Sequence, residues 1–186
     1  MKTFNITTLK EEDIHHLLTL QKDNLKQNLD AETIDSQGFV SFVYLPEDIK
    51  GMMRYEPQII AVDGNDIVGY ALTASFEYAQ TVKLLQPLAE KSSSLAYDDT
   101  PLSILRYYIM GQVCVKAGYR GIGVFDALYQ GHKEHLSAKY DGVITEIASE
   151  NKRSLAAHRR VGFETIYEYR DEISQIDWEI VFWKFN

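Results

Sequence analysis

The sequence has little cysteine, no long apolar run and no excess of positive charge. Its 186 residues include one cysteine, Cys114, which excludes an internal disulfide and a cysteine-based metal cage. No stretch approaches the ~18 apolar residues of a membrane-spanning helix, and the N-terminus lacks the apolar run of a signal peptide. The formal net charge is −8, whereas binding nucleic acid through bulk charge needs a basic face. These absences predict a cytoplasmic protein that binds neither nucleic acid nor a membrane.

The five histidines form no zinc-binding pattern of the HExxH or Cys/His kind. His132 and His135 lie three residues apart on an expected helix, which is a spacing that suits two metal ligands. No third ligand lies near them in the sequence, so a solvated helix face is the better interpretation. We therefore expect no metal site.

Composition predicts one globular domain over residues 1–186. Charged residues make up 25% and apolar residues 45%, a balance that argues against disorder and allows a sizeable core. There is no internal repeat. A serine run and two adjacent aspartates predict a loop over residues 90–100.

Periodic patterns predict strands interleaved with helices, and therefore an α/β fold with a mixed sheet and helices on both faces. Thr8 and Glu11 have the spacing of a capping box at a helix start. Asp63-Gly64-Asn65-Asp66 is a strong hairpin turn signal. The expected strands are 4–6, 58–62, 67–76, 107–115, 142–148, 164–169 and 178–185. Apolar residues at helical spacing over 14–29 predict a first helix, and a second helical stretch is expected within 39–53, where Pro46 opens the later part. Further helices are expected over 81–88, 121–140 and 152–160.

The most informative segment leads from an expected strand into an expected helix through Arg120, Gly121 and Gly123. At a helix start several backbone amides have no partner inside the helix, and the helix dipole adds partial positive charge. Glycines lack the Cβ atoms that would keep a phosphate at a distance, and Arg120 adds a fixed positive charge. The segment predicts a phosphate-binding turn, with a plain strand-to-helix turn as the alternative.

Two familiar phosphate-binding motifs do not fit this segment. A Walker A loop, GxxxxGK[ST], is absent, and a dinucleotide fingerprint needs a third glycine where the sequence has Asp126. The run from Arg120 to Val124 instead resembles the R/Q-x-x-G-x-G/A motif of the GNAT superfamily of N-acetyltransferases, which binds the pyrophosphate of coenzyme A. Phe125 departs from that motif, because the family usually has Gly or Ala there.

A second block extends the resemblance. From Thr145 to Phe163 the sequence is similar to the next block of the family, which contains a strand, Asn151, a short helix and a Gly-Phe turn. Asn151 also suits a helix N-cap, and Gly162 suits the residue that ends a helix. The resemblance implies the GNAT-like acyl-CoA N-acyltransferase fold, with a central mixed, mostly antiparallel sheet. It also implies a coenzyme site made of Val113, Cys114, Val115, Arg120, Gly121, Ile122, Gly123, Val124, Phe125, Asn151 and Ser154.

The resemblance further implies that an amine attacks acetyl-CoA directly in a ternary complex. An alkyl ammonium, with a pKa of ~10, must first lose a proton, and the departing thiolate can take one from an acid. His158 stands where many members have a tyrosine acid, and an imidazolium can donate near neutrality, although a packed histidine is the alternative. Gln112 replaces the common glutamate base and can only hold a water or the acceptor. Glu146 is therefore the leading base, with a water relay as the alternative.

Cys114 and several aromatic residues each allow two interpretations. An acyl-cysteine route through Cys114 is conceivable, but a small buried core residue is the better interpretation. The aromatic residues either line an acceptor pocket or belong to the core; they are Phe39, Phe42, Tyr44, Tyr107 and Tyr108.

Taken together, the sequence predicts an acetyl-CoA-dependent N-acetyltransferase that uses no metal and acts on a primary amine of a small molecule or a protein. Family members are often dimers, so a homodimer is also expected. A non-catalytic acyl-CoA sensor or interaction domain is the alternative that Gln112 and His158 keep open, whereas a kinase-like domain lacks its Walker lysine. Residues 111–160 hold eight Lys or Arg against five Asp or Glu, a balance of +3, and the remainder carries −11. This division favours an anionic coenzyme and a cationic acceptor.

Overall fold

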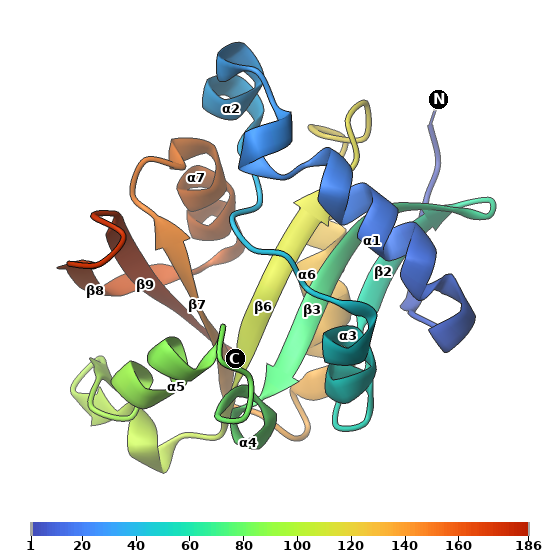
Figure 1. Ribbon diagram of the computed structural model, residues 1–186. Helices are drawn as coiled ribbons and strands as arrows, with labels where there is room; N and C mark the ends of the chain where they lie inside the picture. The colour runs from blue at the N-terminus through green and yellow to red at the C-terminus, as the bar shows by residue number, and fades with distance from the viewer. Residues whose placement is uncertain (1, 186) are drawn as a thin grey trace.

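A seven-stranded mixed sheet forms the centre of the molecule, in the order β1-β2-β3-β6-β7-β9-β8 (Figure 1). The computed structural model describes residues 2–185, and for Asp35 it describes the backbone alone. The strands are β1 Asn5–Thr8, β2 Ile59–Asp63, β3 Asp66–Ser75, β4 Ala96–Tyr97, β5 Thr100–Pro101, β6 Tyr107–Val115, β7 Gly142–Ala148, β8 Glu164–Arg170 and β9 Asp177–Lys184. The helices are α1 Ile14–Asp23, α2 Ala31–Gln37, α3 Pro46–Met53, α4 Phe76–Ala79, α5 Gln86–Ser92, α6 Val124–Leu136 and α7 Lys152–Val161, with short 3-10 turns at Glu11–Asp13, Lys26–Asn28 and Leu102–Ile104.

Helices cover both faces of the sheet, and each face has its own apolar core. On one face α1, α3, α4 and α5 contribute residues to a cluster that includes Leu17, Ile49 and Leu88. On the other face α6 and α7 contribute Leu128 and Leu155 to a second cluster. The predicted fold class, an α/β sheet that is mixed and mostly antiparallel with helices on both faces, is confirmed.

The sheet opens between its two central strands. β6 and β7 run parallel and pair only through Tyr107, Tyr108 and Ile109 of β6, whereas the other neighbours in the sheet are antiparallel. A bulge in the β3–β6 pairing falls at Gly111, just beyond the last of these pairs. In the described part of the chain no strand fills the gap that follows, so the later halves of β6 and β7 border an open wedge.

The segment 38–45, which we call the strap, crosses the front of the sheet between α2 and α3 (Figure 1). The sequence predicted a helical stretch within 39–53 whose later part opens at Pro46, and the helix is that later part, Pro46–Met53. The strap is extended because its backbone bonds to side chains from three directions. Asn151 donates to the Phe39 carbonyl at 3.1 Å, Gln112 donates to the Phe42 carbonyl at 2.8 Å, and Gln21 bonds both backbone groups of Tyr44.

Other local predictions also need correction. The helical pattern expected over 14–29 gives α1, which ends at Asp23, and a separate 3-10 turn at Lys26–Asn28. Thr8 is the last residue of β1 rather than a helix cap, and no side chain within residues 2–185 caps the turn that starts at Glu11. The helix expected over 81–88 lies later, at Gln86–Ser92. The loop expected over 90–100 contains the end of that helix and the β4–β5 hairpin, whose turn residues Asp98 and Asp99 have φ of 48° and 60°.

The helix expected over 121–140 is shorter, at Val124–Leu136, because Gly121 and Gly123 take positive φ angles. Along residues 2–185, none of the helices is both long enough and apolar enough to cross a membrane.

Candidate functional site

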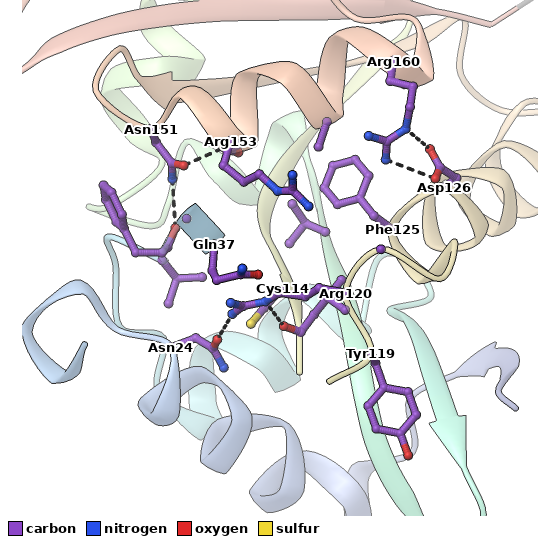
Figure 2. A pocket seen from close by; sticks show the side chains of 18 of the residues that line it. Asn24, Gln37, Cys114, Tyr119, Arg120, Phe125, Asp126, Asn151, Arg153 and Arg160 are labelled. Carbon is purple, nitrogen blue, oxygen red and sulfur yellow. Dashed lines mark hydrogen bonds and ion pairs between the residues drawn. The ribbon is translucent and has the colours of Figure 1, made fainter. Parts of the chain in front are cut away.

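A cavity of about 290 Å³ lies beside the wedge, between the end of β6, the starts of α6 and α7, and the strap (Figure 2). Nine of the residues predicted to bind coenzyme line it, namely Val113, Cys114, Val115, Arg120, Gly121, Gly123, Phe125, Asn151 and Ser154. Two others do not contribute side chains, because Ile122 is 46% exposed on the surface and Val124 is buried in the core below.

The turn before α6, residues 120–123, forms the floor of this cavity, and we call this turn the cradle. Gly121 has a φ of 77° and Gly123, the N-cap of α6, a φ of 93°, both in the region that favours glycine. A Cβ built on either glycine meets no described atom within 4 Å, so space is open in front of both. The first backbone amides of α6 have no carbonyl partner inside the helix. The turn therefore offers donors and room to an anion, and that it binds a phosphate stays a prediction.

Arginine side chains give the cavity its charge. Arg120 donates to the Val115 carbonyl at 2.9 Å and to Asn24, and burial lowers the pKa of its guanidinium from its ordinary value. Arg153 points into the cavity in Figure 2 and makes no ion pair with any carboxylate side chain that the structure describes. Arg160 is different, because both its contacts to Asp126 measure 3.1 Å. Two cations thus remain for a ligand.

Asn151 has the structural role that the sequence predicted and a second one. Its Oδ1 accepts from the Ser154 amide at 3.1 Å, which caps α7. Its Nδ2 donates to the strap at Phe39, so the same side chain holds the helix start and the cavity wall together. The sequence did not reveal the cavity residues Asn24 and Gln37, which reach the site from segments without a recognisable motif, or Tyr119, which directly precedes the motif at Arg120.

A second, narrower cavity of about 70 Å³ lies in the wedge between β6 and β7. All three predicted catalytic residues, Gln112, Glu146 and His158, line it. The two cavities share Phe39, Val40, Val113, Asn151 and Ser154, so they meet at the start of α7.

Glu146 is a carboxylate held in a largely apolar place. Burial raises its pKa above the ordinary value, and the hydrogen bond from Tyr169 partly offsets that rise. The Tyr169 hydroxyl donates to Oε2 at 2.8 Å, and Lys91 Nζ lies 4.0 Å from the centre of the Tyr169 ring. This single tether leaves Oε1 able to accept a proton or an ammonium group.

Gln112 is committed to the strap. Its Nε2 donates to the Phe42 carbonyl at 2.8 Å, and its Oε1 accepts from the Tyr70 hydroxyl at 2.5 Å. The sequence predicted that this amide holds a water or the acceptor, but both its polar atoms already bind protein groups.

His158 is buried and neutral. Its Nδ1 lies 2.8 Å from the Ser154 carbonyl, which can only accept, so Nδ1 carries the hydrogen and Nε2 accepts from Tyr129 at 2.6 Å. Burial lowers the pKa of the ring to about 4. This neutral ring differs from the imidazolium acid that the sequence predicted, because desolvation disfavours the charged form. The Phe125 ring packs edge-on against it, with centroids 5.0 Å apart.

The remaining candidates separate into site and core. Burial raises the pKa of the Cys114 thiol to about 12, which fits the core interpretation rather than a nucleophile. Phe39 and Phe42 line the second cavity, whereas Tyr44, Tyr107 and Tyr108 are buried in the core.

The side chains of His132 and His135 on α6 do not converge on a common metal ion, because each ring faces a different backbone carbonyl. His132 Nε2 lies 3.1 Å from the Ala71 carbonyl, while His135 Nδ1 lies 2.8 Å from the Gly131 carbonyl. Between residues 2 and 185 no group of three or more His, Cys, Asp and Glu is placed to hold a metal ion.

Solved structures provide the comparison, since no protein-family model and no curated protein matches the sequence. NAA60 from Arabidopsis thaliana, in complex with a bisubstrate analogue, has a TM-score of 0.66 at 15% identity, covering 99% of each chain. The ribosomal-protein-S18-alanine N-acetyltransferase from Escherichia coli has a TM-score of 0.62 at 12% identity, covering 98% of this chain and 94% of the other. A chimera of Vibrio cholerae spermidine N-acetyltransferase SpeG and hSSAT has a TM-score of 0.60 at 13% identity, covering 97% and 95%. The resemblance predicted from the two sequence blocks is confirmed at the level of the fold.

Proposed function

We propose that this chain, which has the fold of the GNAT N-acetyltransferases, transfers an acetyl group from acetyl-CoA to a primary amine. The observation that carries the proposal is the meeting of two unlike cavities at the start of α7. One has open helix amides and unpaired arginines, and the other has a buried carboxylate. The fold neighbours named above include acetyltransferases of protein and small-molecule amines, and NAA60 has also been solved in complex with acetyl-CoA.

The residues of the larger cavity fit the coenzyme. The amides at the start of α6, together with Arg120 and Arg153, would hold its phosphates, and the positive φ angles of Gly121 and Gly123 keep that space free of Cβ atoms. When bound, acetyl-CoA supplies a thioester carbonyl that an amine can attack directly.

Glu146 serves as the base in this proposal. An amine becomes a nucleophile only after its ammonium form loses a proton, and Oε1 of Glu146 is the acceptor atom that Tyr169 leaves available. Burial raises the pKa of Glu146 toward that of the amine, which makes the proton transfer less unfavourable.

His158 positions other groups in this arrangement. Because its ring is neutral and both nitrogens are engaged, it orients Tyr129 and the first turn of α7, where Ser154 Oγ lies 3.3 Å from Nδ1. Release of a thiol with a pKa of ~8.5 does not demand a dedicated acid near neutral pH.

A non-catalytic acyl-CoA sensor is the second candidate. Gln112 and His158 favour it, because the polar atoms of both side chains already form hydrogen bonds with protein groups. Of the three predicted catalytic side chains, this leaves Glu146 alone to transfer a proton.

Thiol release from acetyl-CoA over a panel of amines tests the proposal. We expect amine-dependent release of coenzyme A and an acetylated product by mass spectrometry. Glu146→Gln should lower kcat by about 10²–10⁴-fold, the usual worth of a general base, while the Kd for coenzyme A stays unchanged. Glu168→Gln, an exposed isosteric change on β8, is the matched control and should retain full activity. Tight coenzyme binding without release on any amine would identify the sensor instead.

A further inference from the structure

We propose that the narrow cavity in the wedge is the acceptor site, and that it selects a primary monoamine with an uncharged, apolar body, such as an alkylamine or arylalkylamine. This inference rests on the proposed function and specifies its substrate class.

The charges of the cavity match one ammonium group and no further ion. Glu146 is the one carboxylate among the described residues that line it, and that lining includes no lysine or arginine. The neutral His158 ring adds no charge. A second ammonium, as in a polyamine, would therefore lie in the cavity without a partner. The carboxylate of a free amino acid would face Glu146, and Lys91, the cation that acts on Glu146 from beside the Tyr169 ring, is not among the lining residues that could pair with it. An unpaired charge of either kind is costly away from water.

Apolar side chains form the rest of the walls. Leu84 and Leu88 come from the start of α5 and the turn before it, on one side of the cavity. Phe42 of the strap stacks on Trp178 of β9 on the other, with ring centroids 5.9 Å apart and planes 9° apart. An uncharged hydrocarbon body loses contact with water against these surfaces, which favours its binding.

The shape of the cavity favours an unbranched carbon beside the amine. Its volume is about 70 Å³, against about 290 Å³ for the coenzyme cavity that it joins. The strap narrows the opening of this cavity, because Gln112 of β6 and Asn151 at the start of α7 hold the strap backbone on both sides of the wedge. A protein lysine also presents an alkyl ammonium, but it would have to bring a polypeptide against this strap, so we assign the site to a small molecule.

A comparison of kcat/KM among amines, with each value expressed per free amine at the assay pH, tests this assignment. We expect kcat/KM for pentylamine and 2-phenylethylamine to exceed that for 1,5-diaminopentane, glycine and a lysine-containing peptide by about tenfold or more, which corresponds to about 1.4 kcal/mol. Preference for the diamine, the amino acid or the peptide would overturn the monoamine assignment and leave acetyl transfer intact. Absence of transfer to every amine would overturn both proposals.

A charge placed at the cavity wall provides the second test. Leu84 is half-buried there, so Leu84→Glu adds a second carboxylate to the site, and Leu84→Gln is the uncharged control of equal size. We expect Leu84→Glu to raise the ratio of kcat/KM for 1,5-diaminopentane to that for pentylamine by about tenfold relative to Leu84→Gln. Equal ratios in the two variants would place the amine body elsewhere and refute the assignment.

Discussion

Glu146 and Tyr169 form the pair of side chains on which the proposed chemistry depends most. Their hydroxyl–carboxylate hydrogen bond of 2.8 Å joins β7 to β8, two strands that are separated by β9. A hydrogen bond to the charged form of a carboxylate lowers its pKa, while burial raises it. In the proposed mechanism, the pair therefore sets the pH at which Glu146 becomes able to accept the proton of the amine.

Removing the tyrosine hydroxyl should shift that pH upward. In Tyr169→Phe, the carboxylate loses its hydrogen bond, so we expect the ascending limb of kcat/KM to move to higher pH by about one unit. The expected sign follows because the active form is the carboxylate, and a higher pKa delays its formation. Pre-steady-state binding of coenzyme A should not change.

Tyr167→Phe is the matched control for that experiment. Tyr167 lies on the same strand and its ring also contacts Lys91, at 5.0 Å, but within the described chain Glu146 receives its hydrogen bond from Tyr169. A limb that moves equally in both variants, or in neither, would show that Tyr169 does not tune Glu146.

Single residues were predictable from the sequence where their role follows from neighbours in the chain. Asn151 capping α7 is such a case, because a cap needs only the amides that follow it. Tyr169 was not predictable, since it reaches Glu146 through two strand pairings. The neutral state of His158 was also not predictable. The pKa of its ring depends on burial by residues that are distant in sequence or follow in the next turn, such as Tyr129 of α6 and Phe163 just before β8.

Among the elements, strands and the glycine turn were predicted well and the strap was not. β6 and β7 have the predicted bounds, because β-branched and aromatic residues mark them clearly. The strap is rich in apolar residues, which suits a buried helix as well as an extended segment. Its extended conformation is stabilised by hydrogen bonds from the side chains of Gln21, Gln112 and Asn151, which are distant in sequence. Tertiary hydrogen bonds of this kind override local propensity.

The turn that begins α6 offers a test at the level of the element. We expect Gly123→Glu to weaken coenzyme A binding by about 100-fold or more, because the side chain enters the cradle with a charge like that of a phosphate. Isothermal titration calorimetry would measure the change.

Gly64→Glu controls for backbone strain in that test. Gly64 also has a positive φ, of 60°, and also has no described atom within 4 Å of an added Cβ, but it lies in the β2–β3 turn. Both variants should lose roughly 1 kcal/mol of stability from the left-handed conformation. Equal coenzyme affinity in the two would remove the cradle assignment.

Across the whole molecule, the net charge of −8 conceals a local positive site. Arg120 and Arg153 stand without carboxylate partners among the described side chains, while most other arginines are paired. The division of charge along the chain predicted this site, although it could not tell which cations stay unpaired. A single domain and a homodimer stay predictions.

Coenzyme A should stabilise the folded chain as a whole. At 100 times its Kd we expect about 2.7 kcal/mol of stabilisation, or a rise in Tm of about 5–10 °C for a chain of this size. Pantetheine, which lacks the phosphates, should give a much smaller rise. Arg153→Gln should reduce the shift, whereas Lys152→Gln, an exposed neighbour outside the cavity lining, should not. Equal shifts with coenzyme A and pantetheine would contradict a phosphate site.

The turn before α6 holds its ligand, in our proposal, largely through backbone amides and through the absence of Cβ atoms at Gly121 and Gly123. Main-chain groups are the same in every protein, so such a site places few constraints on which side chains surround it. Over evolutionary time the sequence around it is free to diverge almost completely while the two glycine conformations persist. Relatives of this chain should therefore be recognised more readily by similarity of backbone structure than by sequence identity.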